Sequence, residues 1–362
     1  MKQIQWNLRQ LFEGDTDPEL EKERQRTEDK SYRFINKWKD RTDYLEAPAV
    51  LGQALEEYEM WSGDCGTDGN EGYYFWLRTQ QDQNDPVLKA RFNQVEDFSR
   101  TIQNNIQFFQ LRIAKIPSGQ QKKFLDYKRL REYKHFLERI FAEAKYLLSE
   151  PEEKILNIKA STSYSNWIKM TSGFLAKEQR NVLLEDGTKG SKNLSELSSL
   201  LDSKNKKVRD SAAKALNGLF EKYVEVAEAE LNSVLANKKT DDELRGLLRP
   251  DLSRHISDDI GSEIVDALID TVSGRFDIGH RFYELKAKLL GLKKLKYHER
   301  NIEYGDLIKK YPYKTSLKLV DRVFKRLDPE FSEILSMFLK NGCFDVYPRR
   351  GKGSGAFCAH HL

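Results

Sequence analysis

The chain has 362 residues, of which 39% are hydrophobic and 33% are charged, and its formal net charge is +4. Because 61 Lys and Arg are nearly balanced by 57 Asp and Glu, the composition argues against a dedicated nucleic-acid binder, which would show a segregated positive excess. The 19 Phe, 16 Tyr and 5 Trp exclude a disordered chain, because so many aromatic anchors supply a sizeable core.

The three cysteines, Cys65, Cys343 and Cys358, are too widely spaced for a CxxC metal knuckle or a disulfide framework. The N-terminus has no apolar signal segment, and no uncharged apolar run approaches the roughly 20 residues of a membrane span. We therefore expect a cytoplasmic protein with no membrane partner.

The first half of the chain shows helical periodicity. Asp17-Pro18-Glu19 is a typical helix start, with a capping carboxylate followed by a proline. From Pro86 to Ile113, apolar residues recur every three or four positions, which predicts one helix of about seven turns. Ser149 and Glu152 have the spacing of a capping box and predict another helix start.

In the second half, the apolar run at 182–188 fits either a strand or an exposed loop, and the Gly/Ser/Lys-rich stretch 187–193 is a linker candidate. Helical periodicity then resumes. The pattern predicts one long helix from about residue 206 to 235, one capped by 257–259, one closed by Gly291, and a last one from Asp328 to Gly342.

The last twenty residues differ from the rest of the chain. Residues 343–347 alternate as a strand would, 348–355 are basic and glycine-rich, and 356–359 are apolar again. A frayed tail and a truncated domain both fit this pattern. We favour truncation, because a globular domain rarely finishes on an apolar strand without a partner.

A search for catalytic motifs finds no complete one. His298-Glu299 begins like an HExxH zinc helix, but Ile302 stands where the second histidine is needed. Cys358 and His360 would share one face of a strand, yet two ligands do not make a site. The basic run 289–298 favours a helix end over a phosphate site. The residues alone indicate a helical protein without a complete active site.

Two stretches, 283–292 (YELKAKLLGL) and 345–358 (DVYPRRGKGSGAFC), closely resemble the oligoendopeptidase F branch of the thimet-oligopeptidase-like zinc metallopeptidases. The segments 6–12 and 249–255 are similar too. The resemblance implies a mainly α fold, with the long antiparallel helices of a two-lobed oligopeptidase and a short strand segment near the C-terminus. In this family two histidines of an HExxH helix and a later glutamate hold zinc, so the resemblance implies an N-terminal fragment that stops before that helix.

The resemblance also implies three regions: an N-terminal helical region at 1–115, an oligoendopeptidase N-terminal lobe at 116–200, and the incomplete beginning of a catalytic domain at 201–362. It implies zinc in the intact enzyme and short peptides as substrates. No position matches a catalytic residue or a zinc ligand, so we expect this chain to hold no metal and to be inactive alone. The sequence makes no prediction of its oligomeric state.

Eight residues are candidates for the border of the substrate cleft. They are Arg349, Arg350, Lys352, Gly355, Phe357, Cys358, His360 and His361. The three cations are expected either to hold the loop or to meet a peptide carboxylate. If the domain is cut, helices near 262–290 and 316–340 should expose apolar faces and favour self-association.

The alternative to a peptidase fragment is a complete, non-catalytic helical scaffold or peptide-binding module. A third hypothesis, nucleic-acid binding through 292–300, has the least support, because the net charge is nearly balanced.

Overall fold

The computed structural model describes residues 4–66, 69–305, 311–353 and 355–359. The predicted mainly α fold is confirmed: helices make up most of the described chain, and its two strands form one small sheet. Short 3-10 turns join several of the helices. They span Leu8–Gln10, Asp43–Leu45, Lys128–Leu130, Ala144–Tyr146 and Tyr297–Glu299.

The front region of the molecule, which we define as α1 to α7, contains the largest core. Its helices are α1 (Glu19–Trp38), α2 (Pro48–Asp64), α3 (Gly69–Gln81), α4 (Pro86–Ile106), α5 (Phe108–Ala114), α6 (Ser118–Leu125) and α7 (Lys134–Glu143). Phe109 is fully buried at the centre, with its ring 5.2 Å from that of Phe34 and 5.4 Å from that of Tyr44. Phe124 and Leu137 belong to the same cluster, so one core includes side chains from both sides of the 115/116 boundary.

Two long antiparallel helical layers follow the front region. One layer is α8 (Glu150–Ala160), a π-helical turn (Ser161–Ser165) and α9 (Asn166–Lys177); the other is α12 (Val224–Arg245). Glu153 near the start of α8 pairs with Arg245 at the end of α12, with N–O distances of 2.6 and 2.7 Å. At the other end, the rings of Phe174 and Tyr223 stack 5.7 Å apart. These two contacts fix the antiparallel direction of the layers.

The π-helical turn has a local cause. The hydroxyls of Thr162 and Ser163 both donate to the carbonyl oxygen of Lys159 at 3.0 Å. Such hydroxyls compete with the backbone for helix carbonyls, and this competition bends helices and disturbs their regular ladder.

A hairpin connects the two layers. Strands β1 (Gln179–Leu183) and β2 (Lys189–Asn193) are antiparallel, with Val182 opposite Gly190, and α10 (Leu194–Leu200) and α11 (Lys206–Lys222) follow. Val182, Leu197 and Leu216 form a separate buried cluster. The apolar run near 182 is therefore a strand. The linker expected at 187–193 is wrong, because those residues form the turn and second strand of the hairpin.

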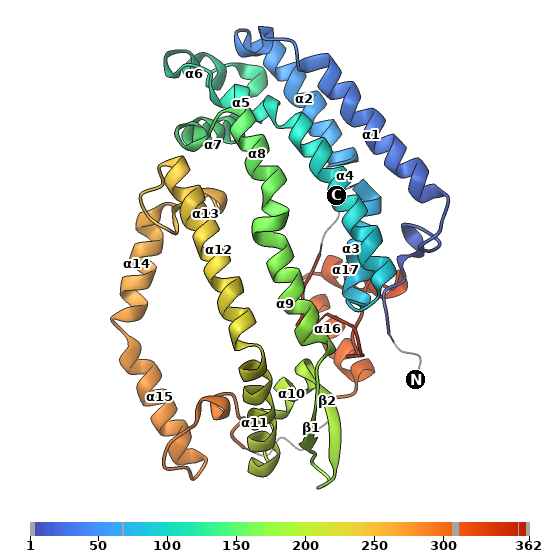
Figure 1. Cartoon of the computed structure of the whole chain (residues 1–362), viewed down its shortest axis with the longest axis vertical. Helices are drawn as coiled ribbons and strands as arrows, with labels where there is room; N and C mark the ends of the chain where they lie inside the picture. The colour runs from blue at the N-terminus through green and yellow to red at the C-terminus, as the bar shows by residue number, and fades with distance from the viewer. Residues whose placement is uncertain (1–3, 67–68, 306–310, 354, 360–362) are drawn as a thin grey trace.

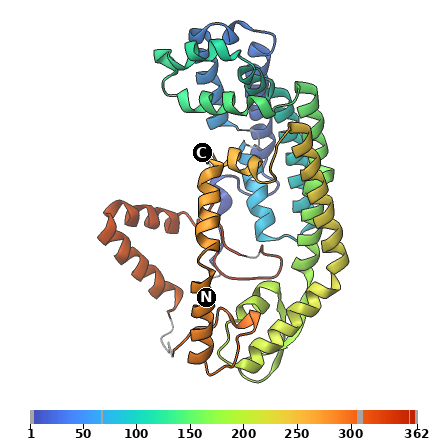
Figure 2. The same ribbon diagram turned by 90° about the vertical axis from the view of Figure 1, so that its left-hand side faces the viewer.

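The remaining helices leave much of their apolar surface exposed. They are α13 (Leu252–Ser257), α14 (Ser262–Ser273), α15 (Phe276–Leu289), α16 (Tyr313–Leu327) and α17 (Pro329–Lys340). In Figure 2 the α16–α17 hairpin projects away from the helical layers. Leu268, Phe282, Leu327 and Met337 are each more than half exposed, so the expected exposure of apolar faces near 262–290 and 316–340 is confirmed.

The capping box at Ser149 is confirmed, and Asp328 caps α17 as expected. Asp17 accepts a hydrogen bond from the backbone N–H of Glu19, the first residue of α1.

Three expected helix boundaries are wrong. The long helix from Pro86 breaks at Gln107, and the helix from Lys206 breaks at Tyr223. The segment 257–259 ends α13 instead of capping the next helix, and Asp259 there has φ +55°.

The strand expected near the C-terminus is also not formed as such. Residues 343–347 are extended but belong to no strand of the described chain. The segment lies beside the N-terminal residues 4–7, because Val346 within it bonds to Ile4 and Gly342 just before it bonds to Asn7.

Candidate functional site

The extended segment that follows α17 returns to the front region. The backbone N–H of Asn7 donates to the Gly342 carbonyl at 2.9 Å, and the Val346 N–H donates to the Ile4 carbonyl at 3.2 Å. Further along, the Gln83 N–H donates to the Gly351 carbonyl at 2.6 Å. Because these bonds use backbone groups at both ends, they hold the docking loop, which we define as residues 343–353, against the N-terminus and the end of α3.

A buried carboxylate organises the docking loop. The side chain of Asp345 is fully buried, and Arg349 binds it with two hydrogen bonds of 2.7 and 2.8 Å. The ammonium of Lys352 lies 2.8 Å from the same carboxylate and donates to the carbonyl oxygens of Asp345 and Tyr347. Burial raises the pKa of Asp345, but the hydrogen bonds from Arg349 and Lys352 outweigh it and hold that pKa below its ordinary value.

The turn of the docking loop requires a glycine. Gly351 has φ +82°, and a Cβ added there would lie 2.2 Å from Oδ1 of Asp82. An L-residue would meet both the strained backbone conformation and a hard contact. The Gly353 N–H then donates to the Gln80 carbonyl at 2.9 Å, which completes the contact with α3.

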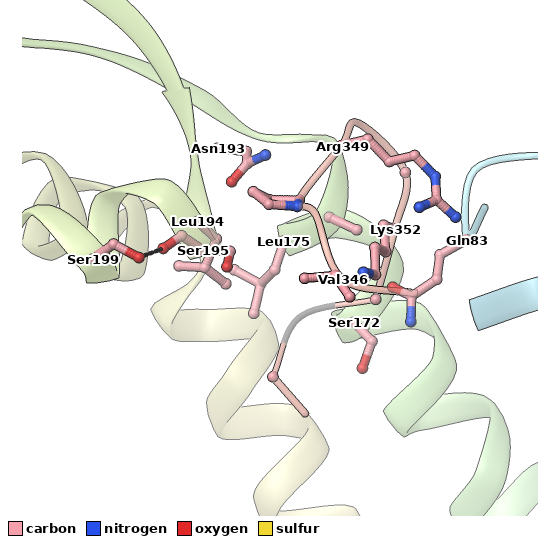
Figure 3. Close-up of a pocket in the computed structure, with 15 residues that line it drawn as sticks. Gln83, Ser172, Leu175, Asn193, Leu194, Ser195, Ser199, Val346, Arg349 and Lys352 are labelled. Carbon is pink, nitrogen blue, oxygen red and sulfur yellow. Dashed lines mark hydrogen bonds between the residues drawn. The ribbon is translucent and has the colours of Figure 1, made fainter. Parts of the chain in front are cut away.

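A pocket of about 390 Å³ lies between the docking loop, α9 and the start of α10. Figure 3 shows side chains that border it from these elements, namely Ser172, Leu175, Asn193, Ser195 and Val346, together with Gln83 from the loop after α3. Asn193 accepts a hydrogen bond from the Glu196 N–H and so caps α10, which places Ser195 in the first turn.

The pocket offers mainly uncharged polar groups and backbone. Arg349 and Lys352 also line the pocket. Both cations are already paired with the Asp345 carboxylate, and Lys352 donates to the loop carbonyls as well. No described histidine lines it, so its serines have no general base beside them there. The arrangement suits a neutral ligand that exchanges hydrogen bonds, such as a peptide backbone, better than a free anion.

Of the eight residues predicted to border the cleft, three line this pocket, and Phe357 and Cys358 follow them along the chain. Arg349, Lys352 and Gly355 line the pocket. Phe357 is half exposed, and its ring lies 5.7 Å from that of Trp6 and 5.2 Å from that of Trp76. Cys358 carries an exposed thiol next to Phe357.

Among the other predicted residues, Arg350 is exposed at the tip of the turn and does not line the pocket. His360 and His361 lie outside the described residues.

Sequence reasoning missed Asp345, which organises the loop. Its spacing of four residues to Arg349 and seven to Lys352 was a usable signal for an ion-paired turn. It also missed Gln80 and Gln83, for which no local signal exists, because more than 260 residues separate them from Gly351 and Gly353 along the chain.

The comparisons with known proteins agree with this architecture. The family model for oligopeptidase F matches residues 112–174, which run from α5 through α9. The chain is 25% identical over 256 residues to an oligoendopeptidase F homolog of Lactococcus lactis, and 24% identical over 246 residues to oligopeptidase PepF of Bacillus subtilis. These matches cover 69% and 66% of this chain.

Among solved structures, oligoendopeptidase F from Enterococcus faecium superposes with a TM-score of 0.70 at 16% identity, over 89% of this chain and 64% of that one. This likeness shows a shared fold. Both the sequence matches and the fold support a relationship of this chain to oligoendopeptidase F proteins. It spans less than half the length of the Lactococcus and Bacillus relatives, 42% and 36% respectively.

The side chains that could hold a zinc ion do not form a suitable site in the described part of the chain. Among the described residues, one group of three metal-binding types has ligand atoms within 4.8 Å of one another, namely Asp210, His298 and Glu299. Lys206 lies 2.7 Å from Asp210, and Arg209 lies 3.1 Å from the buried Glu299. Because two cations already neutralise these carboxylates and would repel a metal ion, the group does not fit zinc.

The position expected for a second zinc histidine supports the same conclusion. It is occupied by Ile302, whose side chain is buried.

None of the helices in the described ranges is long and apolar enough to cross a membrane.

Proposed function

We propose that this chain is the front portion of a zinc-dependent oligoendopeptidase that hydrolyses short peptides, and that it supplies one wall of the peptide channel. Similarity to oligoendopeptidase F proteins supports the reaction class. The observation that carries the role of the chain is the pocket beside the docking loop, which offers hydroxyls, amides and backbone but no activated nucleophile.

The residues of this wall bind and orient; they do not carry out the chemical step. Asn193 and Ser195 from the start of α10 and Gln83 after α3 provide donors and acceptors at fixed positions. Arg349 and Lys352 stabilise the loop through Asp345, so the wall keeps its shape without presenting a free charge. Zinc in the intact enzyme would polarise the scissile carbonyl and its attacking water.

We further propose that the chain alone neither retains zinc nor cleaves peptide, because its 362 residues contain no HExxH motif. The test is incubation of the purified chain with a quenched fluorescent peptide, together with metal analysis. We expect no chelator-sensitive cleavage and no stoichiometric zinc. One tightly held zinc per chain with chelator-sensitive cleavage would contradict the proposal.

Peptide binding by the wall is tested separately, by fluorescence anisotropy of a labelled short peptide. Ser195→Trp places a large side chain in the pocket and should weaken binding about tenfold, equivalent to about 1.4 kcal/mol. Ser198→Trp is the matched control on the same helix, because Ser198 is exposed and does not line the pocket. Equal peptide affinity of the two variants would contradict a role of this pocket in peptide binding.

A peptide-binding module without catalysis is the second candidate, and the same uncharged pocket favours it. Reading the coding sequence downstream of codon 362 separates the two candidates. An in-frame HExxH favours the peptidase, whereas an immediate stop codon favours the module.

A further inference from the structure

Two of the three cysteines carry exposed thiols near the candidate site. Cys343 and Cys358 are free and exposed, whereas Cys65 is buried in the front core. Burial raises the pKa of Cys65. Because the thiolate is the reactive form, Cys65 is the inert cysteine and the other two are the accessible ones.

The two exposed cysteines are equally far along the chain from a turn. The Lys352 N–H donates to the Arg349 carbonyl at 3.3 Å, so the chain reverses direction between these residues. Cys343 comes six residues before Arg349, and Cys358 comes six residues after Lys352. When the two arms of such a turn run back together, residues at equal distance from it lie opposite each other.

Contacts with the N-terminal segment bring the two arms together. The carbonyl of Gly342, next to Cys343, accepts a hydrogen bond from Asn7. The ring of Phe357, next to Cys358, lies 5.7 Å from the ring of Trp6. The neighbours of the two cysteines therefore contact consecutive residues of one segment.

Tyr73 on α3 gives an independent sign of this proximity. Its pKa is raised by burial first, and then by the negative charges that Cys343 and Cys358 carry when ionised. Both thiols thus lie within electrostatic reach of the same phenol, which itself packs on Trp76.

We propose that Cys343 and Cys358 form a reversible intramolecular disulfide when the protein meets an oxidised low-molecular-weight disulfide. The thiolate of one cysteine attacks the small disulfide, forms a mixed disulfide and releases one small thiol. The second cysteine attacks the protein sulfur of that mixed disulfide, forms the Cys343–Cys358 bond and releases the second small thiol. Two protein thiols are oxidised, the small disulfide is reduced by two electrons, and the two protons pass to the released thiols.

This bond would join the two arms at the base of the turn that lines the pocket. It would restrain the arms around Arg349 and Lys352, and with them the pocket border formed by Val346 and Gly355. Reversible disulfides with exposed, accessible sulfurs are typical of redox-responsive sites. Formation of this disulfide does not require peptide hydrolysis by the chain.

The test uses the whole chain at low concentration with oxidised glutathione, followed by alkylation and tryptic digestion without reductant. Trypsin cuts after Lys340, Arg349 and Lys352, so the bond would join peptide 341–349 to peptide 353–362. We expect this linked peptide, its loss after reduction, and simultaneous loss of both exposed thiols. Tryptic cleavage at the exposed Arg350 of the intact protein should also become slower.

Three variants make the test specific. Cys65→Ser should still give the linked peptide, whereas Cys343→Ser and Cys358→Ser should each leave a mixed disulfide with glutathione on the remaining cysteine. Separate mixed disulfides on both cysteines of the unmodified chain, or disulfide-linked dimers in place of the linked peptide, would overturn the proposal.

Discussion

The front region and the α14–α17 region are built from similar amphipathic helices but pack differently. In the front region the apolar stripes of several helices meet, and Trp38, Phe109 and Phe124 are fully buried. In α14–α17, Leu268 and Leu327 are 62% and 70% exposed. The difference teaches that an apolar stripe specifies a helix locally, whereas burial requires a second stripe that faces it.

The largest expected effect comes from equal truncations in the two regions. Phe109→Ala should lower the free energy of unfolding by about 3–5 kcal/mol, because it opens a cavity among packed aromatic rings. Phe331→Ala on α17 should change it by no more than about 0.5 kcal/mol, because that ring is 49% exposed. Denaturant unfolding of both variants checks this, and equal losses would break the comparison.

The docking loop is the part of the C-terminal region that shares the packing of the front region. Asp345→Asn should cost up to about 3 kcal/mol, because it leaves the Arg349 and Lys352 cations without their buried carboxylate. Asp43→Asn, which removes an exposed ion pair with Arg41, should cost much less, because solvent screens that pair. The check is denaturant unfolding together with hydrogen exchange at the Gln83 amide; unchanged exchange in Asp345→Asn would contradict the account.

Two glycines with the same φ angle separate backbone strain from the steric contact that the docking loop makes with its neighbour. Gly187 and Gly351 both have φ +82°, but an added Cβ meets nothing at Gly187 and Asp82 at Gly351. Gly187→Ala should cost about 1 kcal/mol from backbone strain alone. Gly351→Ala should cost at least about 1 kcal/mol more, because of the contact. Thermal unfolding of both variants measures the difference, and the reverse order would be inconsistent with the docked turn.

The smallest expected effect is on the pH dependence of stability, through Glu178 at the junction of the two helical layers. Hydrogen bonds from Lys222 and Tyr223 lower the pKa of Glu178 to about 2. This folded-state pKa lies below the ordinary value of 4.5. The stabilisation that ionised Glu178 gives to the folded state is therefore complete above that pH and is lost as pH falls towards 2. Glu178→Gln should therefore flatten the fall in stability across this window. Glu221→Gln, an exposed change on α11, serves as control and should leave the slope unchanged.

Local signals predicted the fold well because helices start and stop for local reasons. The capping box at Ser149 and the Asp328 cap of α17 follow from a few neighbouring residues. The breaks at Gln107 and Tyr223 could not be predicted, because the apolar period continues across both. Tertiary packing outweighs a weak local preference at such points.

The candidate site was predictable only in part. The glycine-rich turn and its cations were visible as a motif, and the structure shows that the cations stabilise the loop through Asp345. The partners of the turn on α3 and α10 come from distant parts of the chain, and no periodicity or spacing links them.

Hydrogen–deuterium exchange of the whole chain tests most directly the central claim, that a packed front region holds the docking loop while α14–α17 stay open. The account predicts slow exchange in α4 and α5 and much faster exchange across α14–α17. It also predicts slow exchange at the Gln83 amide, which donates to the docking loop, and at the Gly353 amide, which donates from the loop to α3. Protection of α14–α17 equal to that of the front region, or rapid exchange at Gln83 and Gly353, would contradict it.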